Sequence, residues 1–277
     1  MKVIKPSVKI IRPNLNDPAV IDEIYSTIQF AGRICYKSKN AKVAELEEKI
    51  ENLHAEKNKT KEYSKEFVNL ARELNQIKKE SARKFIVDAL SRKHESIIEH
   101  ISITFCMIVD RGVSHEIVRH RLASYTQEST RYCSYDKDKF GNEITVIEPV
   151  FYKDIPQERK EAIENMFNTT HDSSSELLNS LSPIEKRYAD WWYACHVAEQ
   201  TYLEMMHFGA TAEEARDVLP TSTKTEIVIT MNLRELRHFL SLRAAGTTGK
   251  PHPQMAEVAV ILLEELKEKM PEIFGDI

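Results

Sequence analysis

A polar stretch at residues 119–132 constrains the fold of this chain more than any other segment. It reads RHRLASYTQESTRY, with arginines on both sides of His120 and another at Arg131. A run so rich in cations and hydroxyl groups is too polar to lie in a hydrophobic core. Arginine presents a rigid fork of donors that suits phosphate or carboxylate. Two interpretations are open: a basic helix end followed by a hydrophilic loop, or a site that binds an anion.

Composition limits the partners that this stretch could have. The chain has 277 residues, enough for one large domain or two small ones with a substantial core, and a formal net charge of −4. Proteins that bind the nucleic-acid backbone are usually basic, so we expect no nucleic-acid partner and only a local phosphate site. No apolar run is long enough to span a bilayer, so we expect no membrane partner either.

The N-terminus and the cysteines indicate a cytoplasmic location. Residues 1–13 carry no apolar segment or cleavage site of the kind found in signal peptides. The four cysteines are scattered and form no CxxC pair, as expected for free thiols in a reducing compartment. Neither a GxGxxG motif nor a P-loop motif occurs, so a Rossmann or P-loop nucleotide site is not expected.

Hydrophobic periodicity predicts a mixture of strands and helices. The predicted strands cover residues 3–11, 101–109, 144–150 and 224–231. The predicted helices cover residues 18–35, 81–92, 114–121, 157–181, 184–208, 211–219, 233–243 and 255–266. The strand at 101–109 is apolar throughout and should be buried on both faces or nearly so. Residues 110–112 are predicted to form a turn.

Three helix starts carry recognisable capping residues. Asp17 precedes Pro18, which suits the first helical position. Ser114 is the expected N-cap of the helix that leads into the polar stretch. In that helix Arg119 and Arg121 would point to nearly opposite sides. Asn232 is the expected N-cap of helix 233–243, with Glu235 as its capping-box partner.

Residues 42–79 form the most unusual segment. Apolar residues recur at steps of three and four in two runs, and the remaining residues are mostly Lys, Glu and Asn. This pattern predicts two amphipathic helices arranged as a hairpin or short coiled coil. The segment is either an arm that binds a partner or another subunit, or an inserted hairpin that lies on the domain surface.

The sequence HESIIEH at residues 94–100 invites a metal hypothesis. Its two histidines lie six residues apart, which does not match the spacing of HExxH zinc sites. We therefore expect no metal, and two interpretations remain: a polar turn at the edge of a site, or a corner between a helix and a strand.

The polar stretch resembles a known family. Arg119-His120-Arg121 followed after seven residues by Ser129 matches the RHRx7S signature of flavin-dependent thymidylate synthases. The segments AGRICYKS, HESIIEH, ARDVLP and NLRELRHFLSLR also look like that family. The resemblance runs from about residue 20 to the C-terminal helix and is interrupted only at residues 42–79.

The resemblance implies a fold and an activity. It implies an α+β fold of the flavin-dependent thymidylate synthase type, with an antiparallel or mixed central sheet flanked by long helices and with the inserted hairpin. Residues 1–277 would form one catalytic domain. Such enzymes are homotetramers that bind FAD at subunit interfaces. They convert dUMP to dTMP, with 5,10-methylenetetrahydrofolate as one-carbon donor and NADPH as reductant, and release tetrahydrofolate.

The resemblance also implies site residues. The positions that match FAD contacts are Ser96, Arg119, His120, Arg121, Gln127, Asn232, Arg234 and His238. The positions that match dUMP contacts are Glu116, Ile117, Val118, Arg119, Gln127, Glu128, Ser129, Thr130, Arg131, Arg216 and Arg243. Arg243 matches the catalytic arginine that polarises the uracil. No metal ligand is implied.

The implied chemistry suits these residue types. The uracil must become electron-rich at C5, and a guanidinium near its carbonyls and N3 stabilises the negative charge that develops there. Ser129, the backbone near Thr130, and Arg131 suit the dUMP phosphate. No general base for a nucleophilic Ser129 is evident, and Cys133 is expected to be a bystander.

Two other functions are compatible with the sequence. A non-catalytic phosphate-binding module could use the same arginines, and it would be colourless and would take up no FAD. A coiled-coil scaffold built on residues 42–79 would lose its function with that arm, whereas a synthase would keep dUMP-dependent NADPH oxidation.

Overall fold

The computed structural model describes residues 1–57, 65–168 and 179–277 of the chain. The fold is α+β, with a predominance of helix, as predicted. The chain divides into two compact units. The first unit comprises Met1–Lys9, Phe105–Thr230 and Phe239–Leu262, and the second comprises Ile10–Thr104, Met231–His238 and Leu263–Ile277. That both serve one catalytic domain, residues 1–277, stays a prediction.

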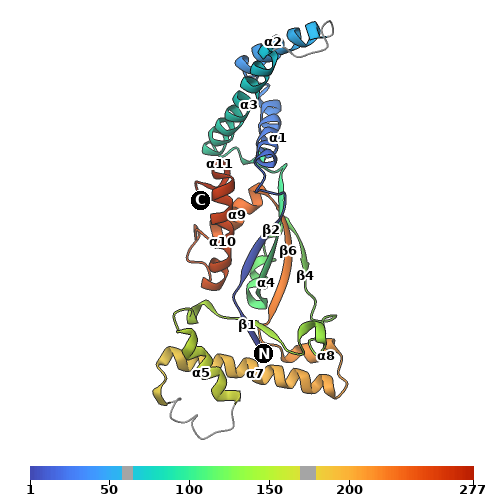
Figure 1. Ribbon diagram of the computed structural model, residues 1–277. Helices are drawn as coiled ribbons and strands as arrows, with labels where there is room; N and C mark the ends of the chain where they lie inside the picture. Colours follow the sequence, from blue (N-terminus) through green and yellow to red (C-terminus); the bar gives the residue numbers. More distant parts are fainter. Residues whose placement is uncertain (58–64, 169–178) are drawn as a thin grey trace. The chain divides into compact units, whose positions relative to one another are not determined.

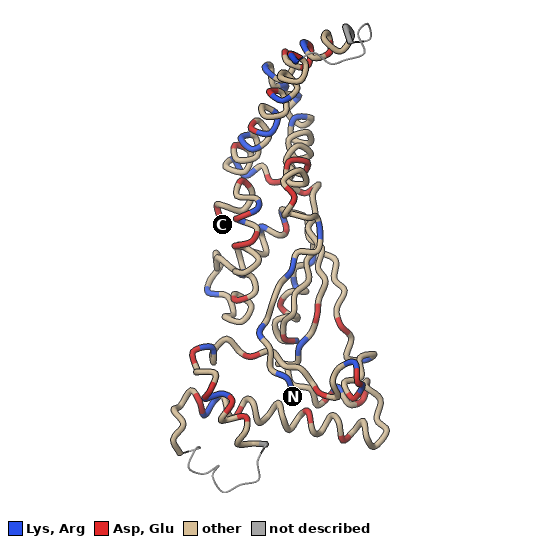
Figure 2. The backbone as a smooth tube through the Cα atoms, in the orientation of Figure 1, with Lys and Arg blue, Asp and Glu red and all other residues tan. Residues whose placement is uncertain are grey.

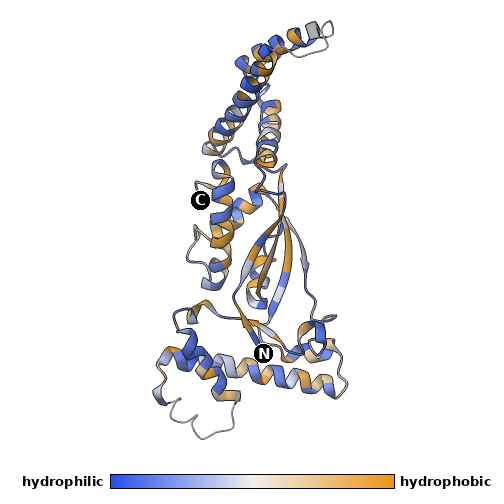
Figure 3. Ribbon diagram, viewed as in Figure 1, coloured by the Kyte–Doolittle hydropathy of each residue, from blue (hydrophilic) through white to orange (hydrophobic). Residues whose placement is uncertain are grey.

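A four-stranded sheet carries the chain's most apolar strands (Figures 1 and 3). It contains β2 (Ser7–Arg12), β3 (Ser102–Asp110), β6 (Lys224–Asn232) and β4 (Ala123–Gln127), in the order β2-β3-β6-β4. At the end of β3, the backbone amide of Arg111 donates to the carbonyls of Thr221 and Thr223, just before β6. Because the end of β3 meets the start of β6, these two strands run antiparallel.

Strand β3 buries one face fully and most of the other, whereas β6 buries one face fully and leaves the other partly exposed. On β3 every second side chain is fully buried, whereas Cys106 and Ile108 between them are half-buried. On β6 the buried positions likewise alternate with partly exposed ones such as Glu226. The prediction that residues 101–109 are buried on both faces or nearly so is therefore confirmed, because the pleat directs successive side chains to opposite faces and both faces of β3 are largely buried.

The N-terminal strand is split in two. Instead of one strand at residues 3–11, the chain forms β1 (Lys2–Ile4) and then β2, with Pro6 between them. Proline lacks the amide hydrogen that a strand ladder requires, so it separates the two strands. β1 pairs in parallel with β5 (Thr145–Ile147) in a separate two-stranded sheet, with Lys2 opposite Thr145.

Two long helices belong to the first unit. α5 (Gln157–Asn168) packs against α7 (Pro183–His207), and Ile163, Tyr188 and Trp192 form part of their buried core. α7 begins with Ser182 as N-cap and with Glu185 completing a capping box. The predicted helix 157–181 extends beyond Asn168 into residues 169–178, which lie outside the described residues.

Short elements complete the first unit. α7 is followed by Gly209, with φ +89°, and by the short helix α8 (Ala212–Ala215), which Thr211 and Glu214 cap reciprocally. Three 3-10 turns and a short helix complete this unit: η2 (Asp138–Phe140), η3 (Val150–Tyr152), η4 (Arg216–Val218) and α4 (Arg111–Ile117).

The second unit is built on helix α1 (Pro18–Tyr36). Asp17 caps it by accepting from the amide of Ala19, and Pro18 occupies its first turn, as predicted. α1 packs along α3 (Lys65–Ser91), which also contacts α2 (Ala41–Lys57) and α11 (Pro271–Phe274). The core between α1 and α3 includes Ile28 and Ile86, neither of which is exposed.

Helices α2 and α3 form the hairpin that was predicted for residues 42–79. They contact each other, and α3 runs without a break into the helix predicted at 81–92. Leu46 is the one described residue of α2 that is buried. Basic and acidic residues are interspersed along both helices (Figure 2). The connection at residues 58–64 lies outside the described residues.

The C-terminal part of the chain consists of helices. The amide side chain of Asn232 accepts from the backbone of Glu235 at 2.9 Å, which confirms Asn232 as the cap of α9 (Leu233–Arg243). The last long helix is α10 (Pro253–Lys269). Earlier in the chain, the 3-10 turn η1 (Glu95–Ile98) precedes β3.

In the described part of the chain, no helix has the length and apolar character needed to cross a membrane.

Glu185 should make the stability of the chain depend on pH in the acid range. A hydrogen bond from Arg159, at 2.6 Å, and further bonds from Ser182 lower the pKa of Glu185 from 4.5 to about 2. A carboxyl group with a lowered pKa stabilises the fold above its unfolded-state pKa, and this contribution is lost as the pH falls through its folded-state pKa. We expect Glu185→Gln, which preserves the capping box, to unfold at a lower urea concentration than the wild type at neutral pH.

The difference between the two urea midpoints should shrink between about pH 4.5 and pH 2, where wild-type Glu185 becomes protonated. Urea unfolding of both proteins at several pH values measures this. A difference that stays constant over the whole range would contradict the stabilising charge on Glu185.

Candidate active site

Helix α4 leads from strand β3 into the arginine motif. Its N-cap is Asp110, whose carboxylate accepts from the amide of Val113 at 2.8 Å. Ser114, which we had predicted as the cap, lies inside the helix and donates to the carbonyl of Arg111. The turn predicted at 110–112 is therefore wrong as well, because Asp110 starts the helix at the end of the strand. Asp110 also accepts from the side chain of Gln254.

The helix ends before the arginine motif. α4 stops at Ile117, so the predicted helix through residue 121 is wrong, and the opposed helical directions of Arg119 and Arg121 do not apply. The single hydroxyl proton of Tyr125 is shared between the carbonyl of Ile117, at 3.0 Å, and that of His120. These bonds satisfy carbonyls that further helix would have used, which holds the motif in a turn.

A cluster of three polar side chains forms where this turn meets the end of α9. Arg243 donates through Nε to Nε2 of His120 at 3.2 Å and through one terminal nitrogen to Glu116 at 3.0 Å. His120 is buried and meets the ring of Phe239 edge-on, with centroids 4.9 Å apart. Nε2 can accept this bond only in the tautomer of His120 that carries its proton on Nδ1. Nδ1 of His252 lies 3.7 Å from the other oxygen of Glu116.

The next two candidate residues direct their side chains into the first unit. The amide nitrogen of Gln127 donates to Ser114 at 2.9 Å and to Thr225 at 3.1 Å. The carboxylate of Glu128 accepts from Tyr135 at 3.1 Å and from Lys224 at 3.0 Å. The carboxylate of Glu128 therefore holds the strand end in place, and a ligand would meet the backbone at this position.

Lys224 and Tyr135 respond electrostatically to Glu128. Burial works to lower the pKa of Lys224, but hydrogen bonds to Glu226 and Glu128 outweigh it and raise the pKa. Burial, reinforced by the charge of Glu128, raises the pKa of Tyr135. Both groups therefore hold their protons, so both donate to the carboxylate.

A tight turn follows at Ser129. Its carbonyl accepts from the amides of Tyr132 and Cys133, and its hydroxyl accepts from the amide of Arg131 at 3.3 Å. Thr130 is buried within the turn. The guanidinium of Arg131 is exposed and pairs with Glu213 of α8 at 3.0 Å.

Arg216 lies close behind this ion pair along the chain. It starts η4, directly after α8, and is exposed. The Arg131–Glu213 contact thus brings the Ser129 turn and the start of the ARDVLP segment into one region of the first unit.

The remaining candidates of the first unit differ in their exposure. Ile117 is fully buried, so only its backbone could meet a ligand, whereas Val118 is partly exposed. Arg119 and Arg121 are exposed, and within the described ranges no ion pair engages either guanidinium.

Four candidates lie in the second unit. Ser96 belongs to η1, and the side-chain oxygen of Asn232 is engaged in capping α9. Arg234 is exposed and pairs with Glu99, and its Nε lies 3.7 Å from Glu95. His238 is exposed on the same helix. The side chains of Arg234 and His238 are therefore accessible, and η1 places Ser96 next to the partner of Arg234.

Several contacting residues were missed by the sequence analysis. Tyr125, Lys224, Glu213 and His252 each contact a candidate residue. Tyr125 lies in the polar stretch, so its hydroxyl was a visible signal. The other three each lie 82 or more positions away from their partners in the sequence. Only the folded chain brings them together.

Comparison with known proteins identifies the family. A family model described as thymidylate synthase complementing protein matches residues 20–272. The flavin-dependent thymidylate synthase of Geobacter sulfurreducens is 31% identical over 193 residues, which cover 69% of this chain and 68% of the relative. That of Pyrococcus furiosus is 32% identical over 194 residues, 70% of this chain and 66% of the relative.

Solved structures agree at the level of the fold. The UMP/dUMP methylase PolB from Streptomyces cacaoi, bound with 5-Br UMP, superposes with a TM-score of 0.61 at 18% identity. The match covers 99% of this chain and 95% of that one. The resemblance drawn from the RHRx7S signature is confirmed, and the chain belongs to the family of flavin-dependent thymidylate synthases.

Proposed function

We propose that this chain binds dUMP and FAD around Arg243, Glu116, His120 and the turn at Ser129, and methylates the uracil there. As a member of its family the chain is an FAD-dependent methyltransferase that converts dUMP to dTMP. The observation that supports this site best is the contact of Arg243 with Glu116 and His120. Glu116 lies 127 positions from Arg243 in the sequence. His120, the central residue of the RHR motif, lies 123 positions from it.

The uracil is assigned to Arg243. Its side chain is 23% exposed, so the guanidinium is shielded from bulk water but still accessible. Two anchors, Glu116 and His120, restrict its orientation, and a positioned cation stabilises charge that develops on a substrate better than a mobile one. Arginine keeps its charge at every relevant pH, so Arg243 can stabilise negative charge on the uracil carbonyls and N3 without losing a proton.

The phosphate is assigned to the turn at Ser129. The exposed guanidinium of Arg131 and the Ser129 hydroxyl offer donors to a dianion, and Arg216 lies in the same region. Arg131 must release Glu213 to bind phosphate. Exposed ion pairs contribute about 0–1 kcal/mol, so this release costs little. Glu128 positions the turn through Lys224 and Tyr135. Ile117 and Val118, at the end of α4, are assigned to the same nucleotide through their backbone.

The chemistry of the exposed cations fits FAD. Arg119 and Arg121 have no ion-pair partner within the described ranges, and a pyrophosphate is a suitable acceptor for both. We assign Gln127, Ser96, Asn232, Arg234 and His238 to the same cofactor, with His120 oriented by Arg243. When bound, FAD supplies the hydride that it receives from NADPH, and the protein orients it.

Other properties of the family are proposed for this chain on the strength of its membership. The one-carbon donor is 5,10-methylenetetrahydrofolate and the reductant is NADPH. We further propose a homotetramer with sites at the subunit interfaces, a cytoplasmic location, and neither nucleic acid nor membrane as a partner. No residue is assigned to a metal, and neither Cys133 nor Ser129 is assigned a nucleophilic role.

Purified protein tests the proposal directly. It should be yellow with a flavin spectrum and should oxidise NADPH in a dUMP-dependent manner. It should form dTMP only when dUMP and methylenetetrahydrofolate are both present. Colourless protein that takes up no added FAD would overturn the proposal. Flavin-containing protein that forms no dTMP would overturn the substrate assignment.

Replacing Arg243 should impair turnover more than flavin binding. We expect Arg243→Ala to keep its flavin absorbance while dTMP formation falls about 10²- to 10³-fold, the usual effect of removing one preorganised charge-stabilising group. Arg243→Lys keeps the charge but loses the fork that contacts both Glu116 and His120. Its rate of dTMP formation should therefore lie between those of the wild type and Arg243→Ala. Steady-state rates and bound-flavin content measure this. Unchanged turnover in Arg243→Ala would remove Arg243 from the reaction.

Replacing Arg131 should weaken binding of the phosphate specifically. We expect Arg131→Ala to raise the Kd for dUMP about 10- to 100-fold, the size of a lost charged hydrogen bond. The matched ligand is deoxyuridine, which lacks the phosphate and whose weaker binding should not change. Calorimetric titration of both ligands into both proteins is the measurement, and an equal loss for the two ligands would contradict the phosphate assignment.

A further inference from the structure

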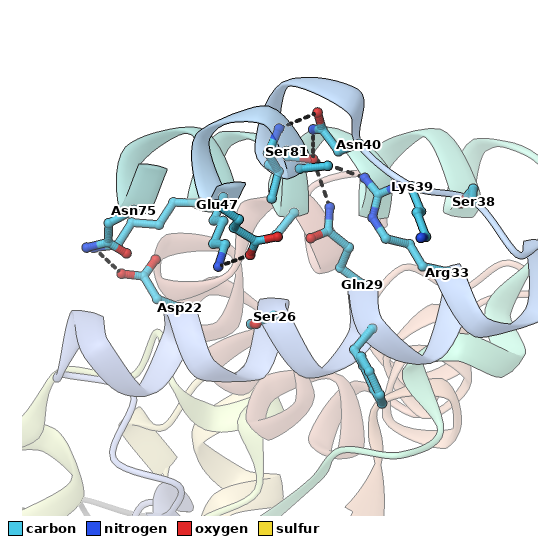
Figure 4. A pocket seen from close by; sticks show the side chains of 16 residues that line it. Asp22, Ser26, Gln29, Arg33, Ser38, Lys39, Asn40, Glu47, Asn75 and Ser81 are labelled. Carbon is cyan, nitrogen blue, oxygen red and sulfur yellow. Dashed lines mark hydrogen bonds and ion pairs between the residues drawn. The ribbon is translucent and has the colours of Figure 1, made fainter. Parts of the chain in front are cut away.

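A cavity of about 630 Å³ lies in the second unit among α1, α2 and α3 (Figure 4). Pockets of this size are large enough for a small-molecule ligand. The hairpin at residues 42–79, which interrupts the family resemblance, supplies a large part of its walls. None of the residues assigned to FAD or dUMP lines it.

Hydrogen-bond donors converge at one end of this cavity. Figure 4 shows Gln29 and Arg33 extending from α1 toward Ser81 on α3, with Asn40 beside them. The Ser81 hydroxyl oxygen lies 2.9 Å from the amide nitrogen of Gln29, 3.1 Å from Arg33 and 3.0 Å from the amide nitrogen of Asn40. A hydroxyl oxygen has only two lone pairs, so three donors exceed what Ser81 can accept.

Two of these donors cannot reverse their direction. The oxygen of Asn40 caps α2 by accepting from the amides of Lys42, at 3.1 Å, and Val43, at 3.3 Å, which leaves its nitrogen facing Ser81. Arg33 can only donate. The two therefore occupy both lone pairs of Ser81, whose own proton can bond the side-chain oxygen of Gln29. The surplus donors at this end are the further N–H groups of Arg33, of which only one terminal nitrogen bonds Ser81.

The charges of the cavity reinforce this imbalance. Lys78 pairs with Glu47 and Lys79 with Asp22, each at 2.7 Å, so these four charges cancel. Arg33 and Lys39 also line the cavity, and neither forms an ion pair with another residue of the described ranges. Arg33 instead lies over the ring of Phe85, 5.3 Å from its centroid. Two uncompensated positive charges thus remain beside the surplus donors.

The cavity also offers an apolar wall. Phe30, on α1, is 68% exposed although it is a large aromatic residue, and Val43 and Ala82 line the space with it. An exposed aromatic ring beside an uncompensated cationic end suits a ligand with two parts. An anionic group would reach Ser81, Asn40 and Arg33, and a flat apolar body would contact Phe30.

We propose that this cavity binds a small molecule that carries a phosphate or carboxylate group on a flat apolar body. The site belongs to the inserted hairpin and does not depend on the proposed roles of Arg243 or Arg131. Ser81 holds the donors in place, and the anion supplies the acceptor that they lack.

Calorimetric titration with two simple probes tests the proposal. Phenyl phosphate and benzoate carry the two anionic groups on the same ring, and inorganic phosphate carries no ring. The titrations use the full-length protein saturated with FAD and dUMP, so that the nucleotide sites are occupied. We expect phenyl phosphate or benzoate to bind with a Kd on the order of 1 mM or tighter, and inorganic phosphate to bind more weakly.

Asn40→Asp is the decisive variant. Aspartate caps a helix as well as asparagine does, so α2 should persist, but a carboxylate oxygen replaces the donor that faces Ser81. We expect the affinity for the preferred probe to fall at least about tenfold, as a donor is lost and a repelling charge gained. Circular dichroism of the variant should match the wild type.

Two matched charge variants complete the test. Lys39→Gln removes an uncompensated charge from the cavity and should weaken binding by roughly three- to tenfold. Lys84→Gln removes an exposed charge from the same helix as Ser81 but outside the cavity, and it should have no effect. Absence of saturable binding by both ring-bearing probes would overturn the proposal. So would equal affinities of the folded Asn40→Asp and Lys84→Gln variants.

Discussion

The contact of Arg243 with Glu116 and His120 is the interaction on which the proposed chemistry depends. A half-buried guanidinium is unfavourable unless charged or polar groups compensate it, and these two residues do so. Both are brought there by the end of α4. Glu116 lies in the last turn of that helix, and His120 follows in the turn that Tyr125 stabilises. The early end of α4 is thus a requirement of the site.

Local signals predicted much of the fold. Asp17 with Pro18, Asn232, and the apolar periodicity of the hairpin each depend on residues within one or two turns, and the structure confirms all of them. The errors lie where contacts from outside the helix or strand decide. The sequence predicted a helix up to residue 121, but α4 ends at Ile117, whose carbonyl contacts the Tyr125 hydroxyl. Strand β4 was missed because its residues are polar, and they pair with β6 about a hundred positions away.

The candidate site was predictable in its residues but not in their roles. The RHRx7S signature drew attention to Glu128 by its position, yet its carboxylate faces Lys224 and Tyr135, so it supports the turn from inside. No pattern in the sequence marks Lys224 as its partner, because sheet pairing alone brings the two together. Arg243 at a helix end could equally have been a charge that complements the helix dipole.

The cations of the chain differ in whether a carboxylate already faces them. Arg131 and Arg243 each have one, Glu213 and Glu116. A ligand at Arg131 must displace an exposed partner, whereas the better-shielded Glu116 can stay and orient Arg243. Arg33 and Lys39 form no ion pair within the described ranges, so an anion there need not break one. Binding in the hairpin cavity therefore requires no exchange of ion pairs. Salt should affect its affinity for anions only by screening the attraction between ligand and cations, whereas at the nucleotide site salt also acts on an ion pair that the ligand displaces.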